Sequence, residues 1–534
     1  MVEENEMSKT TSQDIKATLW KAAGTFRGTI DAANYKDFVL SMLFLKYLDD
    51  TYKEFLRDLE ERYKGNQIRI ERAKKNLPFV LGEKERFDYL YENRFDPKIG
   101  EMINTALQGI QDSNTELRGV FRSINFNSES MLGNPQQKVT KLRTLLEDFK
   151  PLCLEPSQIE VGPGEDPAYV IGDAYEYMVG EFAAEAGKKA GSFFTPSMVS
   201  ELMGMVTAPR AGDSIYDPTC GSASLLIRTA RQAGNLDQVA IYGQEMNGSS
   251  WSMARMNLFI HGIHVNPNDI AWGDTLANPQ HLDSDGNLKQ FDVIVANMPF
   301  SLDKWAEGFN PGGQEDGGSD KDKKFKMTAN LDRFHRFDWG VPPASKGDWA
   351  FLLHMIHSLR SNGRMAAVVP HGVLFRGSAE GRIRQTVIEK NLLDAVIGLP
   401  ANLFYGTSIP ACILVFKKNR TTNDVLFIDA SGKDADGNLR YRKDKNQNKL
   451  DQCHIEDIFR AYTERVDVER FAHVASFEEI KANDFNLNIP RYVDTFEEEE
   501  LVDIEEVQGN IERIKAEIAV VEAQMAQYLK DLGL

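Results

Sequence analysis

Short apolar segments that alternate with helix-length stretches are the feature that most constrains the fold. Between residues 191 and 418 the chain contains SIYDP, VAIYGQE, DIAWGD, FDVIVAN, RMAAVVP, LDAVIGLP and ACILVFKK. Strands separated by helices form parallel sheets with helices on both faces. The last two segments lack a helix-length spacer, so we expect an antiparallel pair at an edge of the sheet. The predicted fold class is therefore α/β.

The rest of the chain suggests further regions around this one. Residues 1–165 are predicted to form an all-α N-terminal domain, because DFVLSMLFLKYLDDTYKEFLRDLEERY carries an apolar stripe with charges opposite it. We assign the α/β domain to residues 166–430, an irregular extension to 431–495, and a final helix to 496–534. Residues 302–347 are glycine-rich and charged, which suits either a mobile insertion or a lid over a substrate.

Composition narrows the classes of protein that the chain can belong to. Of its 534 residues 42% are hydrophobic and 27% charged, and no apolar run approaches the roughly 18 residues of a membrane span. The N-terminus lacks the apolar core of a signal peptide, and the four cysteines form no CxxC pair, so we expect a cytoplasmic protein. Its net charge of −18 means that it either binds no nucleic acid or has a partner that supplies positive charge.

A turn of small residues follows the first strand of the α/β region. The strand ends at Asp217, and the turn that follows contains Gly221, Ser222, Ala223 and Ser224 before a helix begins. In doubly wound folds this turn holds a nucleotide-like ligand, because small residues let the backbone approach it and the helix offers free N–H groups. A simple crossover turn has the same composition, so this signal alone is weak.

Acidic residues end the next two strands. Glu245 can accept hydrogen bonds from both hydroxyls of a ribose, and Asp274 can accept one from an adenine amino group. Either residue could also be an ordinary surface acid. The loop lacks GxGxxG, and a dinucleotide would need a second mononucleotide unit. The spacing therefore favours an adenosine ligand without pyrophosphate, and S-adenosylmethionine is the cofactor that we predict.

The fourth strand runs into Asn297, Met298, Pro299 and Phe300. Methylation of an exocyclic amine needs acceptors for its hydrogens, because the nitrogen lone pair is delocalised into the ring. The Asn297 side-chain oxygen and the Met298 backbone carbonyl can be those acceptors, Pro299 stiffens the turn, and Phe300 can stack on a flipped base. A plain turn with an apolar plug is the alternative. The position of the Asn-Met-Pro-Phe tetrad after three strand tips that carry acids favours a catalytic role.

These residues resemble a known family. The tetrad is similar to the Asn-Pro-Pro-aromatic motif of adenine amino-methyltransferases, with Met298 in place of the first proline, and GSFFTPSMVSELM resembles the Phe-Thr-Pro element that covers their cofactor. The order of motifs matches the gamma class. The stretches LWKAAGTFRGTIDAANYKDFVLSMLFLKYLDD and GLPANLFYGTSIPACILVFKK resemble modification subunits of type I restriction-modification systems. The resemblance implies a Rossmann-like S-adenosylmethionine-dependent methyltransferase core acting on adenine N6, with no metal.

The resemblance also assigns roles to residues of this chain. It implies that Glu245 contacts the ribose and Asp274 the adenine, that Asp217 and Gly221 shape the methionine end, and that Cys220 is a small apolar filler rather than a nucleophile. Further cofactor contacts are implied at Ser192, Phe193, Phe194, Thr195, Pro196, Ser197, Ser222, Ala223 and Ser224.

The same family works with partners, which explains how an acidic chain could act on DNA. The resemblance implies one DNA specificity subunit for two modification subunits, and motor-nuclease restriction subunits in the full complex. Independently, spacings of three and four predict a coiled-coil seam, although packing on the chain's own core is possible. Its residues are Ile504, Val507, Ile511, Ile514, Ile518, Val521, Met525 and Tyr528. Three other hypotheses stay open: a stand-alone adenine methylase, a protein glutamine-amide methyltransferase, and a non-catalytic scaffold.

Overall fold

We describe the protein from a computed structural model, which defines residues 9–186, 194–310, 326–434, 436–444, 447–494 and 504–532. The chain groups into two units, Met1–Val493 and Asp494–Leu534. Within the described ranges, every helix is too short or too polar to span a lipid bilayer.

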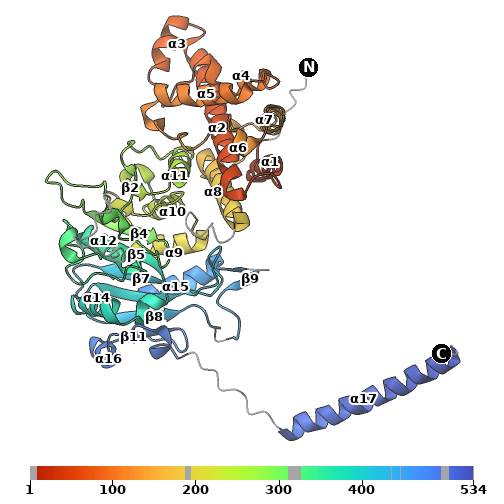
Figure 1. Ribbon diagram of the computed structural model, residues 1–534, viewed down its shortest axis with the longest axis vertical. Helices are drawn as coiled ribbons and strands as arrows, with labels where there is room; N and C mark the ends of the chain where they lie inside the picture. Colours follow the sequence, from red (N-terminus) through yellow and green to blue (C-terminus); the bar gives the residue numbers. More distant parts are fainter. Residues whose placement is uncertain are drawn as a thin grey trace, which may run out of the picture. The chain divides into compact units, whose positions relative to one another are not determined.

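The first part of the larger unit is helical, as predicted (Figure 1). Its helices are α1 (Ser12–Gly24), α2 (Ala32–Tyr63), α3 (Gln67–Lys74), α4 (Phe87–Glu92), α5 (Ile99–Ser113), α6 (Glu129–Leu132), α7 (Pro135–Phe149) and α8 (Pro167–Ala186). Their apolar faces share one core, which also includes Met253, Phe259 and Ile260 from helix α11 (Gly248–Ile260). The helical part is therefore packed firmly against the α/β part rather than tethered to it.

A nine-stranded sheet forms the centre of the unit, in the order β11-β8-β6-β7-β5-β4-β1-β2-β3. Its strands are β1 (Ser214–Asp217), β2 (Ala240–Glu245), β3 (Ile270–Trp272), β4 (Phe291–Asn297), β5 (Leu359–Pro370), β6 (Leu393–Gly398), β7 (Ala411–Lys417), β8 (Val425–Asp429) and β11 (Ala472–Ala475). Each predicted strand is present. Strands β3, β2, β1, β4 and β5 are parallel neighbours, so their carboxyl ends lie along one edge.

Alternating side chains of the strands point to opposite faces of the sheet, and two helical layers cover them. Val293 and Val295 pack with α9 (Ser197–Thr207), α10 (Ser224–Arg231), α11 and α15 (Gln452–Glu464). Ile294 and Ala296 pack on the other face with α12 (Asp348–His357), α13 (Gly372–Phe375) and α14 (Ser378–Glu389). Both faces of the central strands are thus buried, which explains their continuous apolar runs.

The two strands predicted to be antiparallel are antiparallel, but the prediction that they lie at the edge of the sheet is wrong. Strands β6 and β7 are antiparallel, but β7 lies between β5 and β6, and β8 and β11 extend the sheet beyond β6. The segment 431–495, which we expected to be irregular, contributes β11 to this sheet. It also contains the hairpin β9 (Arg442–Asp444) and β10 (Gln447–Lys449), and the helices α15 and α16 (Phe477–Ala482).

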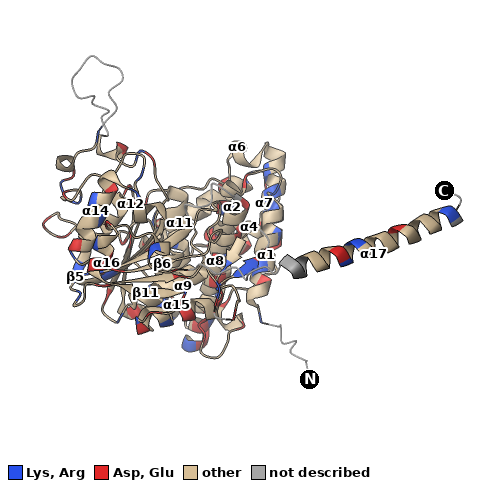
Figure 2. Ribbon diagram, turned by 90° about the horizontal axis from the view of Figure 1, so that it is seen from below, with Lys and Arg blue, Asp and Glu red and all other residues tan. Residues whose placement is uncertain are grey.

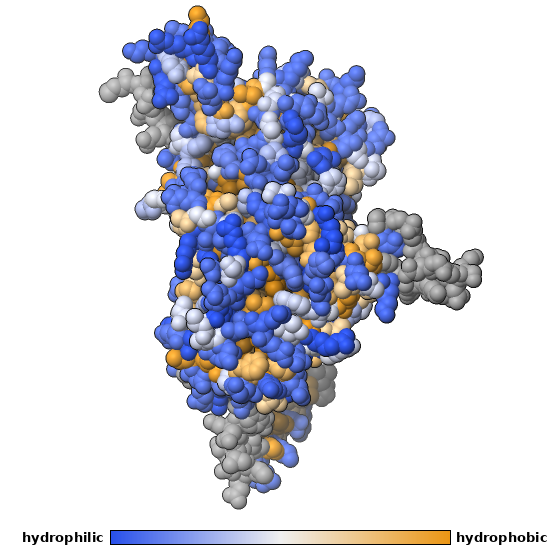
Figure 3. Space-filling view, turned by 90° about the vertical axis from the view of Figure 1, so that its left-hand side faces the viewer, coloured by the Kyte–Doolittle hydropathy of each residue, from blue (hydrophilic) through white to orange (hydrophobic). Residues whose placement is uncertain are grey.

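The smaller unit contains one described helix, α17 (Ile504–Asp531). Charged residues of both signs are spread along it (Figure 2), and Arg513 pairs with Glu517 one turn later. Ile511, Ile514 and Ile518 are exposed, at 46%, 48% and 51% of their surface. The face of the protein in Figure 3 is mostly hydrophilic with scattered apolar side chains, whereas these three isoleucines follow one another at spacings of three and four residues along one helix.

Candidate active site

The turn after β1 lies at the carboxyl edge of the sheet. Asp217 ends β1 and accepts a hydrogen bond from the backbone N–H of Thr219 at 2.8 Å. Gly221 and Ala223 then adopt positive φ angles of 54° and 64° before helix α10 begins at Ser224. This left-handed backbone favours glycine, which explains Gly221, whereas Ala223 adopts it although it has a Cβ.

Two buried carboxylates face this turn. Burial, together with the nearby Glu245, raises the pKa of Asp217 to about 8. Glu245 ends β2 and accepts backbone N–H bonds from Gly221 at 3.0 Å and from Asn247 at 2.7 Å. Burial also raises the pKa of Glu245 above its usual value. A buried acid with few partners suits a cationic ligand, and this fits the sulfonium and ammonium groups of S-adenosylmethionine.

Asp274 follows β3 and has one carboxylate oxygen engaged. Its Oδ1 accepts the backbone N–H groups of Leu276 at 2.9 Å and Ala277 at 3.3 Å. No described residue donates to Oδ2, so this oxygen can accept a hydrogen bond from a ligand.

Exposed apolar side chains flank the tips of β2 and β3. Met246 is 70% exposed, and Trp272 donates its indole N–H to the Met246 carbonyl at 2.9 Å.

The tetrad continues from β4, which pairs with β1 as expected. The Asn297 side-chain N–H donates to the Thr195 hydroxyl at 3.0 Å, which leaves the Asn297 oxygen pointing elsewhere. No described group donates to that oxygen or to the Met298 carbonyl. The Met298 side chain is buried in the core beside α12, which explains why an apolar residue can replace a proline here. The backbone N–H of Ser301, the residue after the tetrad, donates to the Asp348 carboxylate at 2.7 Å.

An aromatic cluster adjoins the tetrad. Phe300 contacts Phe404 edge to face with ring centres 5.7 Å apart, and Phe194 contacts Tyr405 at 5.6 Å. Phe404 and Tyr405 belong to the β6–β7 connection and line a cavity of about 350 Å³. We did not assign a role to either residue from the sequence. The sequence feature that could have indicated them is their position in GLPANLFYGTSIP, the segment that joins β6 and β7, because both strands reach the site.

Six of the predicted cofactor residues line one small cavity, whereas Pro196 and Ser197 line a neighbouring, larger one and Ala223 lines neither. The walls of the small cavity include Phe194, Thr195, Asp217, Cys220, Gly221, Ser222, Ser224 and Asn297. Ser192 and Phe193 lie outside the described residues. Glu245 and Asp274 border the neighbouring turns without lining this cavity. The space inside this cavity is only about 20 Å³, room for roughly one water molecule, which is smaller than a cofactor needs.

A mixed sheet whose parallel strands carry acids at three tips, followed by a small-residue turn and an Asn-x-Pro-aromatic turn, defines an S-adenosylmethionine-dependent amino-methyltransferase. Residues 167–501 match the N-6 DNA Methylase family, and residues 15–149 match the HsdM N-terminal domain. The chain belongs to the N-6 DNA Methylase family and is an adenine-specific DNA methyltransferase of the type I restriction-modification class.

Relatives match over nearly the whole chain. The MpnII methylase subunit of Mycoplasma pneumoniae is 29% identical and covers 94% of this chain and 93% of its own. The HindI methylase subunit of Haemophilus influenzae is 30% identical, with coverages of 82% and 92%. The type I methyltransferase subunit of Streptococcus thermophilus is 35% identical with a TM-score of 0.75, covering 91% of this chain and all of that structure.

Proposed function

We propose that Asn297 and Met298 activate the target amine of adenine. The observation that carries this proposal is the bond from the Asn297 side-chain N–H to Thr195, because it fixes the amide with its oxygen free to accept. The Met298 carbonyl is the second acceptor. Two acceptors aimed at the amino hydrogens draw the nitrogen toward tetrahedral geometry and free its lone pair. The extra proton can leave after methyl transfer, so no strong base is required.

The target base needs a place outside the DNA stack. A base inside a duplex cannot present its amino group to a protein side chain, so it must be flipped out. Phe300 and Phe404 offer aromatic surfaces beside the tetrad, and the cavity next to Phe404 provides space for entry. Rotation of the Phe300 ring away from its edge contact would let the two rings enclose an adenine.

The cofactor roles follow the positions of the strand tips. Glu245 accepts the ribose hydroxyls and Asp274 the adenine amino group, while Asp217, Gly221, Ser222, Ala223 and Ser224 hold the methionine end. Phe194, Thr195, Pro196 and Ser197, with Ser192 and Phe193 before them, cover it. When bound, S-adenosylmethionine supplies an electrophilic methyl group. Helix α9 begins at Ser197 directly after the covering segment, so movement of that segment is the simplest way to open the site.

In this proposal, assembly with a partner supplies the positive charge for DNA binding that this chain lacks. A net charge of −18 is unfavourable for binding the DNA phosphates alone. We propose that a separate specificity subunit reads the DNA, that two copies of this chain join it through α17, and that motor-nuclease subunits complete the restriction enzyme. The exposed isoleucine row on α17 supports a helical partner.

The decisive experiment replaces Asn297 with Ala in the assembled methylase and measures adenine methylation in a single turnover. We expect a loss of at least about a hundredfold with S-adenosylmethionine affinity nearly unchanged, because only the acceptor for the target amine is lost. Asn362→Ala removes an exposed amide away from the site and serves as the matched control. Methylation by Asn297→Ala at the rate of this control would refute the mechanism.

A further inference from the structure

Arg336 is a buried arginine that the proposed mechanism does not use. It is fully buried and lies between the tetrad and α12 in the chain. Its guanidinium donates to both carboxylate oxygens of Asp332 at 2.7–3.1 Å and to the carbonyls of Leu276 at 2.6 Å and Thr275 at 3.5 Å. The remaining contact is with His354 Nδ1 at 3.1 Å. A buried guanidinium is tolerated only when its donors are satisfied in this way.

The two carbonyls that Arg336 holds belong to the turn directly after Asp274. The same turn sends its N–H groups to Asp274 Oδ1, from Leu276 at 2.9 Å and from Ala277 at 3.3 Å. The turn is thus held on one side by the acid and on the other side by the arginine. The position of the Asp274 carboxylate therefore depends on Arg336.

His354 extends this network to β1. Because arginine has no acceptor, His354 Nδ1 must accept from Arg336, and its Nε2–H is left to donate to the Tyr216 hydroxyl at 3.3 Å. Burial, with Arg336 nearby, holds the pKa of His354 well below its usual value, which keeps the ring neutral as this bond requires. The Thr275 hydroxyl adds a bond to the Pro218 carbonyl at 2.5 Å. Arg336 therefore braces the tips of β1 and β3 together.

Gly308 approaches the other oxygen of Asp274. It lies in the loop that continues from the tetrad, and a Cβ at this position would come within 2.7 Å of Asp274 Oδ2 and 2.6 Å of the Ala277 Cβ. Real Cβ atoms do not come so close, so any side chain here would displace the carboxylate or the loop. Only glycine leaves Oδ2 where it is.

We propose that Arg336 and Gly308 are positioning residues that set the Asp274 carboxylate, so that the loop following the catalytic tetrad determines the selectivity of the cofactor site for a 6-aminopurine. The proposal rests on the adenine role of Asp274 given under Proposed function. It also joins the two halves of the reaction, because the loop that presents the target-base residues is the one that shapes the cofactor's adenine end.

The test measures selectivity rather than affinity alone. The dissociation constants of S-adenosylhomocysteine and of its 6-deamino analogue, in which hydrogen replaces the amino group, are determined by calorimetry on the full chain. We expect the wild type to prefer the amino compound by about tenfold or more, as a hydrogen bond to a charged acceptor implies. Arg336→Lys keeps a charge for Asp332 but loses the fork that reaches both carbonyls, and Gly308→Ala moves the carboxylate without removing any buried charge. Both should bring the preference close to one.

Matched variants separate the possible outcomes. Arg384→Lys is the control, because Arg384 is also buried and bonded to backbone carbonyls, those of Phe485, Val373 and Arg376. It should keep the full preference even if it lowers stability. Asp274→Asn tests the proposed site itself: an unchanged preference there would remove the adenine role of Asp274 and the proposal with it. A lost preference in Asp274→Asn, with Gly308→Ala and soluble Arg336→Lys like the wild type, would overturn the positioning role alone.

Discussion

The amide of Asn297 has two chemically different ends, and in the proposed mechanism the side chain serves the target amine only when its oxygen faces that amine. The Thr195 hydroxyl accepts the N–H end at 3.0 Å and so selects this orientation. Thr195→Val removes the acceptor at nearly constant volume and should lower the single-turnover rate by about tenfold, the size of one neutral hydrogen bond. Thr195→Ser should retain the rate. Equal rates for the Val and Ser variants would show that Thr195 does not orient the amide.

We predict that Asp217 makes cofactor binding depend on pH. Burial raises its pKa to about 8, so below this pH the free protein holds the carboxyl protonated. A sulfonium cation favours the ionised form, so binding of S-adenosylmethionine should release a proton, and affinity should rise with pH toward 8, by at most about tenfold per unit. S-adenosylhomocysteine has an uncharged sulfur and should show a flatter profile.

Calorimetry in two buffers of different ionisation enthalpy measures this proton release directly. Asp217→Asn cannot titrate and should bind both compounds with the same pH profile. Equal proton release for S-adenosylmethionine and S-adenosylhomocysteine by the wild-type protein would show that Asp217 does not sense the sulfonium charge.

Residues at strand tips were accessible to prediction because the carboxyl ends of parallel strands meet at one edge. Asp217, Glu245, Asp274 and Asn297 were named from this rule, and the structure places each of them at that edge. Arg336 could not be found in this way. Its contacts with the Asp274 turn join distant segments, and no periodicity or local motif marks a residue whose partners are backbone carbonyls elsewhere.

At the scale of elements, the β6–β7 connection shows that local sequence predicts the direction of two strands but not their position in the sheet. The lack of a helix predicts that the two strands are antiparallel, and they are. Their place in the sheet is a different matter, because β7 inserts between β5 and β6. A clue exists in ACILVFK, whose first six residues are all buried, since a strand without alternation is one covered on both faces. The pairing of β11 with β8 needs tertiary contacts that no local pattern records.

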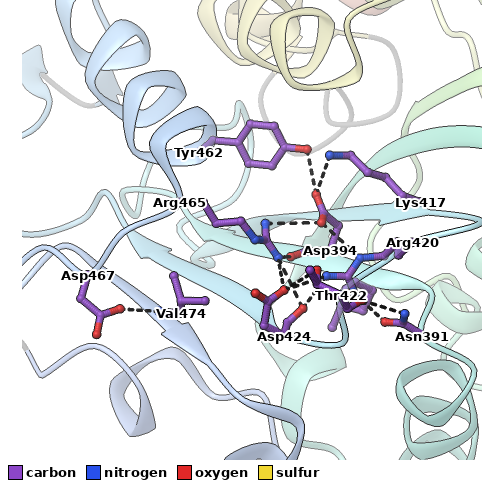
Figure 4. A network of polar contacts seen from close by, with 11 residues as sticks. Asn391, Asp394, Lys417, Arg420, Thr422, Asp424, Tyr462, Arg465, Asp467 and Val474 are labelled. Carbon is purple, nitrogen blue, oxygen red and sulfur yellow. Dashed lines mark hydrogen bonds and ion pairs between the residues drawn. The ribbon is translucent and has the colours of Figure 1, made fainter.

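Asp394 joins three elements at the opposite end of β6 from the site (Figure 4). It accepts from Tyr462 and Lys417 at 2.9 Å and pairs with Arg420 at 3.3 Å and Arg465 at 3.4 Å. The Arg420 side chain is almost fully buried, so removal of the acid leaves this charge with Asp424, at 3.2 Å, as its only described carboxylate partner. Asp394→Ala should lower the free energy of unfolding by about 2–3 kcal/mol, measured by urea titration.

A surface pair provides the comparison for this value. Asp457 pairs with Arg460 on the exposed side of α15, and Asp457→Ala should cost less than about 1 kcal/mol because water already solvates both charges. Similar losses for the two variants would mean that the Asp394 network adds nothing beyond an ordinary surface contact.

At the scale of the whole molecule, the division into two units separates the candidate active site from α17, the helix that we propose for assembly. The sheet, the strand tips and the tetrad all lie within Met1–Val493, and α17 lies in the other unit. Changes in α17 should therefore leave cofactor binding intact. This separation makes the proposed assembly helix testable by itself.

The seam on α17 can be broken without touching the fold. Ile511, Ile514 and Ile518 are about half exposed, so replacing all three with Glu costs the free chain little. In a complex with a partner helix these positions become buried, and uncompensated charge there should cost several kcal/mol, a loss of orders of magnitude in affinity. Changing Ala516, Ala519 and Ala523 to Glu adds the same charge on the opposite side of the helix. We expect the isoleucine variant to bind S-adenosylmethionine normally yet fail to co-purify with the specificity subunit and to methylate DNA, while the alanine variant does both. Recovery of the isoleucine variant in the complex at the yield of the alanine variant would show that α17 is not the assembly helix.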